Sequence, residues 1–183
     1  KYQLFVDQVS LVVRVCVAVK RKLQFYYWKR NELLEFAPDI ELNDVPKVLS
    51  WTGNLICIGY KTEYVLFDIS DEKRRRQDLF PTTTASRSID PCVTLIDNDK
   101  FFGVVKDEHL LTIPTTSDES SSNLLKLDST ASILDPKSNK SFTITWSEPP
   151  ILVVWDEPFL LGLLTDSIEV RVLDTSGLDK DNL

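Results

Sequence analysis

The chain has 183 residues, of which 43% are hydrophobic and 10% aromatic, and its net charge is −7. A chain of this length and apolar content can bury a core, which excludes an intrinsically disordered polypeptide. The acidic balance argues against nucleic acid as the main partner, because phosphate binding needs a basic field. No apolar run approaches the roughly 20 residues of a transmembrane helix, so we expect no transmembrane segment. The sequence has no Met, even at position 1, and we therefore expect it to be an excerpt of a longer chain.

One strand–turn–strand pattern occurs four times along the chain. In the clearest copy, apolar residues 56–59 and 64–67 flank a short polar turn, and both arms are rich in β-branched and aromatic residues. The first turn residues of the four copies are Lys20, Lys61, Lys106 and Thr165, which are 41, 45 and 59 residues apart. A repeat of about 40–45 residues with several short strands predicts a β-propeller, with one sheet per blade.

In chain order, the four repeat units cover residues 1–36, 45–80, 91–127 and 149–183, or about three and a half blades of an all-β propeller. Residues 115–123 and 128–141 are polar and of low complexity, and we expect both to be mobile loops. Each blade buries its faces only against its neighbours. An incomplete propeller would therefore leave an apolar face bare at each end, so the missing blades must come from the parent chain or from a partner.

The repeat places two of the three cysteines at equivalent positions. Four residues before the first turn residues lie Cys16, Cys57, Phe102 and Leu161, which is the composition of an apolar core site rather than a ligand site. We expect Cys16 and Cys57 to be buried free thiols, as in a reducing compartment. Trp51 and Trp155 end the first strands of two units, and we expect them at equivalent packing sites between blades.

The sequence offers little for catalysis. Its single histidine, His109, aligns with Leu23, Tyr64 and Ile168, which predicts a half-buried strand residue. No His/Cys/Asp cluster has metal-ligand spacing and no Gly-rich loop precedes a helix. We therefore predict no catalytic, cofactor-binding or metal-binding residues, no cofactor, and a protein that is not an enzyme.

Two charged turns are candidate partner-binding loops. The first is the basic run Lys73, Arg74, Arg75 and Arg76, and the second holds Asp97 and Asp99 between two predicted strands. The basic run could contact anionic lipid and give peripheral membrane association, and the carboxylates could form an acidic rim for a basic partner. For both loops the alternative is a solvated turn, since Asp71, Glu72 and Asp78 flank the basic run.

Several strand and turn motifs resemble one known family. Residues 15–29, 45–51, 56–61, 78–81 and 144–148 are similar to the citron homology (CNH) domain, and most closely to its members in HOPS-type tethering complexes, with the CORVET-associated relatives as runners-up. The resemblance implies a seven-bladed propeller that serves as a scaffold in vesicle fusion and endolysosomal trafficking. It also implies a cytoplasmic protein, peripheral on the late endosome or lysosome (vacuole) membrane, with Rab-type or Rag-type small GTPases and other tethering subunits as partners. Two alternatives stay open: the CNH domain of a kinase or Rho-exchange factor, and a ligand-binding propeller.

Overall fold

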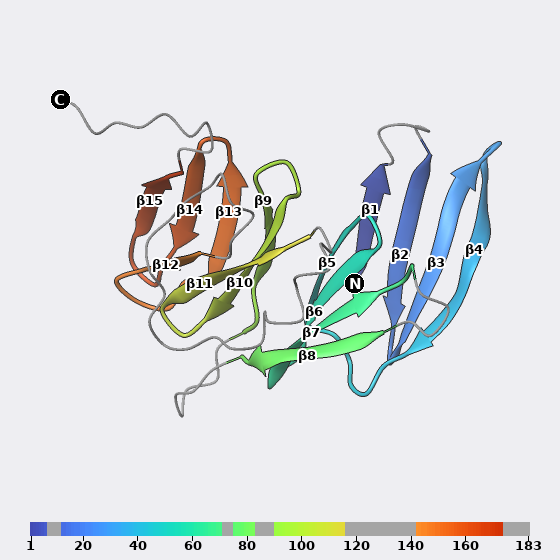
Figure 1. Cartoon of the computed structure of the whole chain (residues 1–183), viewed down its shortest axis with the longest axis horizontal. Coiled ribbons are helices and arrows are strands. Elements are labelled where there is room, and N and C mark those ends of the chain that lie inside the picture. Colours follow the sequence, from blue (N-terminus) through green and yellow to red (C-terminus); the bar gives the residue numbers. More distant parts are fainter. Residues whose placement is uncertain (7–11, 71–74, 83–89, 116–141, 174–183) are drawn as a thin grey trace. The chain divides into compact units, whose positions relative to one another are not determined.

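The structure is a computed structural model that describes residues 1–6, 12–70, 75–82, 90–115 and 142–173. It divides into two compact units, Lys1–Thr82 and Thr83–Leu183. The described residues form four antiparallel sheets, two in each unit, in which strands that are consecutive in the chain lie side by side (Figure 1). The predicted all-β class and the repeated sheets of a partial propeller are confirmed.

The first unit holds two four-stranded meanders. They comprise β1 (Tyr2–Val6), β2 (Val13–Val19), β3 (Lys22–Lys29) and β4 (Glu32–Glu41), followed by β5 (Val48–Thr52), β6 (Leu55–Gly59), β7 (Glu63–Asp68) and β8 (Arg76–Pro81). Two-residue turns close several of these hairpins. The turn between β3 and β4, for example, has positive φ at both Arg30 and Asn31, which matches the right-handed twist of the flanking strands.

The core of this unit lies between its two sheets. Alternate residues of β2 and β3 point toward the second sheet, and alternate residues of β5, β6 and β7 point back. The Trp51 ring is at the centre, 5.7 Å from the ring of Phe5, 6.0 Å from that of Phe25 and stacked at 6.1 Å on that of Phe36. This aromatic cluster ties the two sheets together.

The second unit follows the same plan with seven described strands. They are β9 (Val93–Ile96), β10 (Phe101–Lys106), β11 (His109–Pro114) and β12 (Thr143–Thr145) in one sheet, and β13 (Leu152–Asp156), β14 (Phe159–Leu163) and β15 (Ile168–Val172) in the other. The sequence repeat predicts the end of the third unit at residue 127, whereas its sheet gains a fourth strand, β12, at 143–145. Most of the two predicted loops, 116–123 and 128–141, lies outside the described residues.

A close approach explains one glycine of the second unit. The ring of Trp146, which follows β12, lies against Gly162 in β14, and a Cβ atom at that glycine would be 2.7–3.0 Å from three ring carbons. Such a separation is too short for a side-chain carbon. Gly162 therefore lets a strand of one sheet pack directly on the aromatic residue of its neighbour.

The predicted repeat alignment is shifted by one residue in the third unit. Lys106 pairs with His109 and belongs to β10, so its hairpin has a two-residue turn, whereas Gly59 pairs with Tyr64 across a four-residue turn. Counted from the centre of each turn, the equivalent of Cys57 is thus Gly103 rather than Phe102. A shift of one residue moves a side chain to the opposite face of the strand.

Candidate interaction surfaces

One face of the last sheet is apolar and uncovered. Its exposed side chains come from alternate positions of three strands: Leu152, Val154, Phe159, Leu163, Ile168, Val170 and Val172. On the opposite face, Val153 and Leu160 are buried against the neighbouring sheet. We call the exposed set the β13–β15 face. An apolar surface drawn from every strand of a sheet is larger than the scattered exposed apolar residues of a typical monomer.

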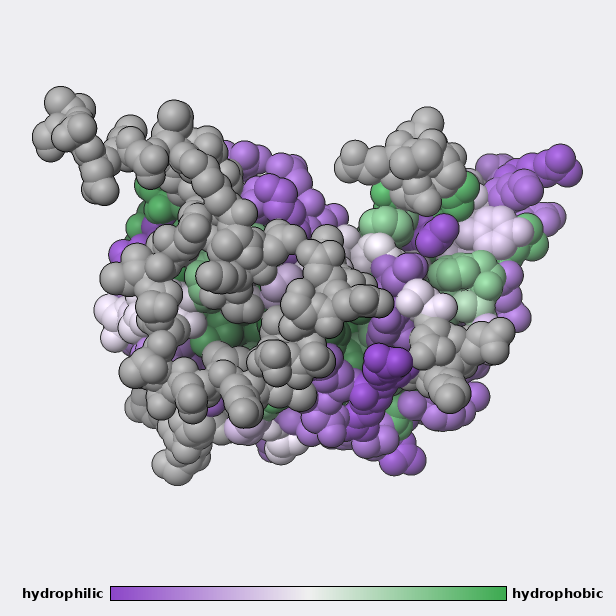
Figure 2. Space-filling model, viewed as in Figure 1, coloured by the Kyte–Doolittle hydropathy of each residue, from purple (hydrophilic) through white to green (hydrophobic). Residues whose placement is uncertain are grey.

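The first sheet has a similar uncovered face. Tyr2, Leu4 and Val6 of β1 are exposed, as are the cross-strand partners Trp28 and Leu33 near the far end of the β3–β4 hairpin. We call this set the β1–β4 face. Hydrophobic side chains are visible at the molecular surface over β15 and over β1–β3 (Figure 2). Both faces have the composition of surfaces that another sheet or a protein partner covers.

The structure describes only part of the basic candidate loop. Lys73 and Arg74 lie outside the described residues, whereas Arg75 is exposed. The Arg76 guanidinium is half-buried and forms ion pairs with Asp78 at 2.7 Å and with Glu63 at 3.2 Å. Arg76 is therefore occupied in holding β7 to β8.

The acidic candidate loop is not a solvated turn throughout. The Asp97 side chain is only 9% exposed and its carboxylate lies 2.9 Å from Lys100 Nζ. Positive φ angles at Asp97, Asn98 and Asp99 curl the loop back on itself, and the Asp99 carbonyl accepts a hydrogen bond from the Thr115 hydroxyl at 2.6 Å. Of the two predicted carboxylates, only Asp99 is exposed.

The predicted core residues differ in their burial. Cys16 and Cys57 are fully buried, and desolvation raises the pKa of both thiols, to about 12 for Cys16. Trp51 is 1% exposed, and its indole N–H donates a hydrogen bond to the Gly53 carbonyl at 3.1 Å. Trp155 pairs with Leu160 as Trp51 pairs with Ile56, yet it is only half-buried at the edge of its cluster. The two tryptophans thus share a register position but not a degree of burial.

The third cysteine has a role that the sequence analysis missed. Cys92 precedes β9, and its sulfur accepts a hydrogen bond from the Val153 N–H of β13 at 3.3 Å. Burial raises the pKa of the Cys92 thiol, and this hydrogen bond partly offsets the shift. The thiol satisfies a backbone donor in a neighbouring sheet, a contact that no local sequence pattern indicates.

The chain's histidine lies at the surface of its sheet. His109 Nδ1 is 3.1 Å from the Thr145 hydroxyl and Nε2 is 3.5 Å from Glu108, but the side chains of His109 and Glu108 are 41% and 48% exposed. Within the described ranges, no group of His, Cys, Asp and Glu side chains could hold a metal ion. The part of the chain that the structure describes contains no helix long and apolar enough to cross a membrane.

Comparisons with known proteins agree on one family. A model of the CNH domain matches residues 2–181. The chain is 41% identical over 168 residues to the vacuolar protein sorting-associated protein 39 homolog of Drosophila melanogaster. This match covers 91% of the chain and 19% of the relative. It is 29% identical over 165 residues to the human Vam6/Vps39-like protein, and this match covers 89% of the chain and 16% of the relative. The chain thus spans less than a fifth of the length of these relatives.

A solved structure supports the fold. The AfRom2 CNH domain is similar with a TM-score of 0.53 at 12% identity, over 98% of this chain and 53% of that chain. At this identity the likeness shows the fold alone. The repeated sheets, the family match over nearly the whole chain and the 41% identical relative lead to one conclusion: this chain belongs to the CNH domain family.

Proposed function

We propose that the chain is the interaction module of a HOPS-type tethering subunit at the late endosome or lysosome. The observation that carries this proposal is the 41% identity over 91% of the chain to a protein named for vacuolar protein sorting. The module acts by binding other proteins and not by turning over a substrate.

The two uncovered faces support a role in which this chain packs against further protein. We propose that additional blades of the full-length protein cover the β13–β15 face and the β1–β4 face, since the similar CNH chain is about twice as long. At about 25 cal/mol per Å² of apolar area, covering these faces is a large stabilising term. The loops at the blade edges then remain for partners.

The partners we propose are a Rab-type or Rag-type small GTPase and other subunits of the tethering complex. An interface of this kind needs about 1,200–2,000 Å² of total buried surface, which the edge loops of several blades together can supply. Among the charged loops, Arg75 and Asp99 are the exposed candidates, and Arg76 and Asp97 contribute ion pairs within the fold. Lys73 and Arg74 adjoin Arg75 in the sequence, and we propose that they contact the same partner.

The test is retention of the full-length protein on immobilised late-endosomal Rab and Rag-type GTPases, each loaded with GDP or GTP. We expect retention on at least one GTPase that depends on the bound nucleotide. We also expect deletion of residues 1–183 to abolish it. If the intact protein is retained on none of these GTPases, or if the deletion leaves both retention and lysosomal tethering unchanged, the proposal fails.

A further inference from the structure

Three segments of the first unit meet on one side of its two sheets. They are the β2–β3 turn at 20–21, the connection 42–47 between β4 and β5, and the β6–β7 turn at 60–63. The connection begins where the Leu42 N–H donates to the Arg21 carbonyl at 2.8 Å, and it ends where the Lys47 N–H donates to the Gly59 carbonyl at 2.9 Å. Five residues span at most about 18 Å, so the two turns lie close together on the same side.

This side carries a set of exposed cations. Lys20 and Arg21 form the first turn, Lys47 ends the connection and Lys61 lies in the second turn; all four are exposed. We call these four residues the cationic rim. Within the described part of the chain, no ion pair involves any of them. They stand out on a chain whose net charge is −7.

The neighbouring carboxylates are engaged elsewhere. Glu41 and Asp39 lie 3.0 and 3.7 Å from Lys22 Nζ, and the hydrogen bond and charge of Glu41 raise the pKa of Lys22. Glu63 pairs with Arg76, and the Asp44 carboxylate accepts a hydrogen bond from the Val45 N–H at 2.7 Å. With Lys22 and Arg76 included, this side holds six cations against five carboxylates, so its net charge is +1, and the four rim cations are the ones that no ion pair within the described residues holds.

We infer that the cationic rim binds the anionic surface of a membrane. The four charges come from three separate segments, and three of them are Lys, whose compact charge suits a field of headgroups better than a fixed bidentate partner. An exposed aliphatic side chain, Val45 at 50%, lies on the same connection as Lys47 and can enter the headgroup region. An acidic protein segment would instead favour arginine side chains placed to donate two hydrogen bonds to each carboxylate. This inference is independent of the proposed GTPase contact.

The expected strength follows from the number of charges. Each Lys or Arg near an anionic leaflet strengthens binding by about fivefold, so two such residues contribute about 25-fold. Because the rim is exposed, the attraction falls off within about 8 Å at physiological ionic strength and weakens as salt is added. Binding should therefore depend on both anionic lipid and salt.

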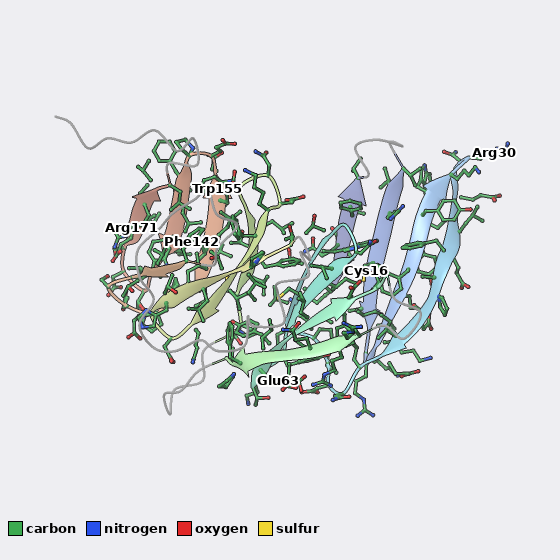
Figure 3. The ribbon with its side chains drawn as sticks, viewed as in Figure 1. Cys16, Arg30, Glu63, Phe142, Trp155 and Arg171 are labelled. Atoms are coloured by element: carbon green, nitrogen blue, oxygen red, sulfur yellow. The ribbon has the colours of Figure 1, made fainter. Side chains whose placement is uncertain are left out.

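The chain offers a charge-matched control at the opposite end of β3. Lys29 and Arg30 are exposed at the other end of β3, where Arg30 lies at the extremity of the β3–β4 hairpin, far from the β2–β3 turn (Figure 3). The variant Lys20→Glu/Lys61→Glu and the variant Lys29→Glu/Arg30→Glu change the net charge by the same amount. The first variant alters the rim, and the second alters the opposite end of the β1–β4 sheet.

The experiment is co-sedimentation of the full-length protein with phosphatidylcholine vesicles that contain or lack phosphatidylserine. We expect binding that requires phosphatidylserine, a loss of at least about 25-fold in the rim variant, and a change of less than about twofold in the control variant. An equal loss in both variants would show that net charge alone matters and would overturn the inference, as would no loss in either. If the rim variant does not fold, judged by hydrogen exchange of β2 and β6, the neutral variant Lys20→Gln/Lys61→Gln replaces it and should show a smaller loss in the same direction. The GTPase retention assay contains no lipid, so its outcome is separate.

Discussion

Replacing Trp51 by alanine should destabilise the first unit more than any other single truncation of its aromatic cluster. A buried Trp removes at most about 250 Å² from water, which corresponds to about 6 kcal/mol at 25 cal/mol per Å² as an upper limit. Alanine retains part of that burial, and Trp→Ala in a core costs about 3–5 kcal/mol. The lost hydrogen bond from the indole N–H to the Gly53 carbonyl adds about 1 kcal/mol. We therefore expect a loss of about 4–6 kcal/mol, a large part of the 5–15 kcal/mol by which a domain is stable.

The assay is hydrogen exchange of the β2–β6 amides in the full-length protein at increasing urea concentration. Trp155→Ala is the matched control, because Trp155 holds the same register position in its sheet but is only half-buried, and its loss should be about half as large. Trp51→Phe keeps a ring against Phe36 and should lie between the two. The reasoning is refuted if Trp51→Ala costs no more protection in its own unit than Trp155→Ala costs in the other.

Three further results are expected. Gly162→Ala should destabilise the second unit by about 1–3 kcal/mol in urea unfolding, because its Cβ would overlap the rigid ring of Trp146; unchanged stability would contradict that contact. Cys16 should resist thiol reagents at pH 8 until the protein unfolds, since burial raises its pKa to about 12. Because the folded state then holds the thiol proton more tightly than the unfolded state does, the contribution of Cys16 to stability should be lost as the pH rises from about 9 to 12. Cys92→Ala should leave the buried Val153 N–H without its acceptor at a cost of about 1–3 kcal/mol, whereas Cys92→Ser should cost less if the sulfur acts as an acceptor.

The sequence by itself was sufficient for the repeated hairpins. The two arms around residues 60–63 are short apolar runs rich in β-branched and aromatic residues, with turn residues between them, and both signals depend only on neighbours in the chain. For the same reason the burial of Cys16 and Cys57 could be expected from their place in the repeat. The same local signals allow an alignment error of one residue, because the sequence around Lys106 does not distinguish a two-residue turn from a four-residue turn. The structure decides this by pairing Lys106 with His109.

Only the tertiary structure decided what each face and each charged loop contacts. Alternation assigns Val154 and Trp155 to opposite faces of β13, but it cannot say which face has a neighbouring sheet. The burial of Asp97 depends on a loop that curls back onto Lys100, and the cationic rim depends on hydrogen bonds between residues up to 21 positions apart. Local patterns report the conformation of a short segment, whereas burial and clustered charge arise from segments that meet through space, and that meeting is fixed by packing between sheets.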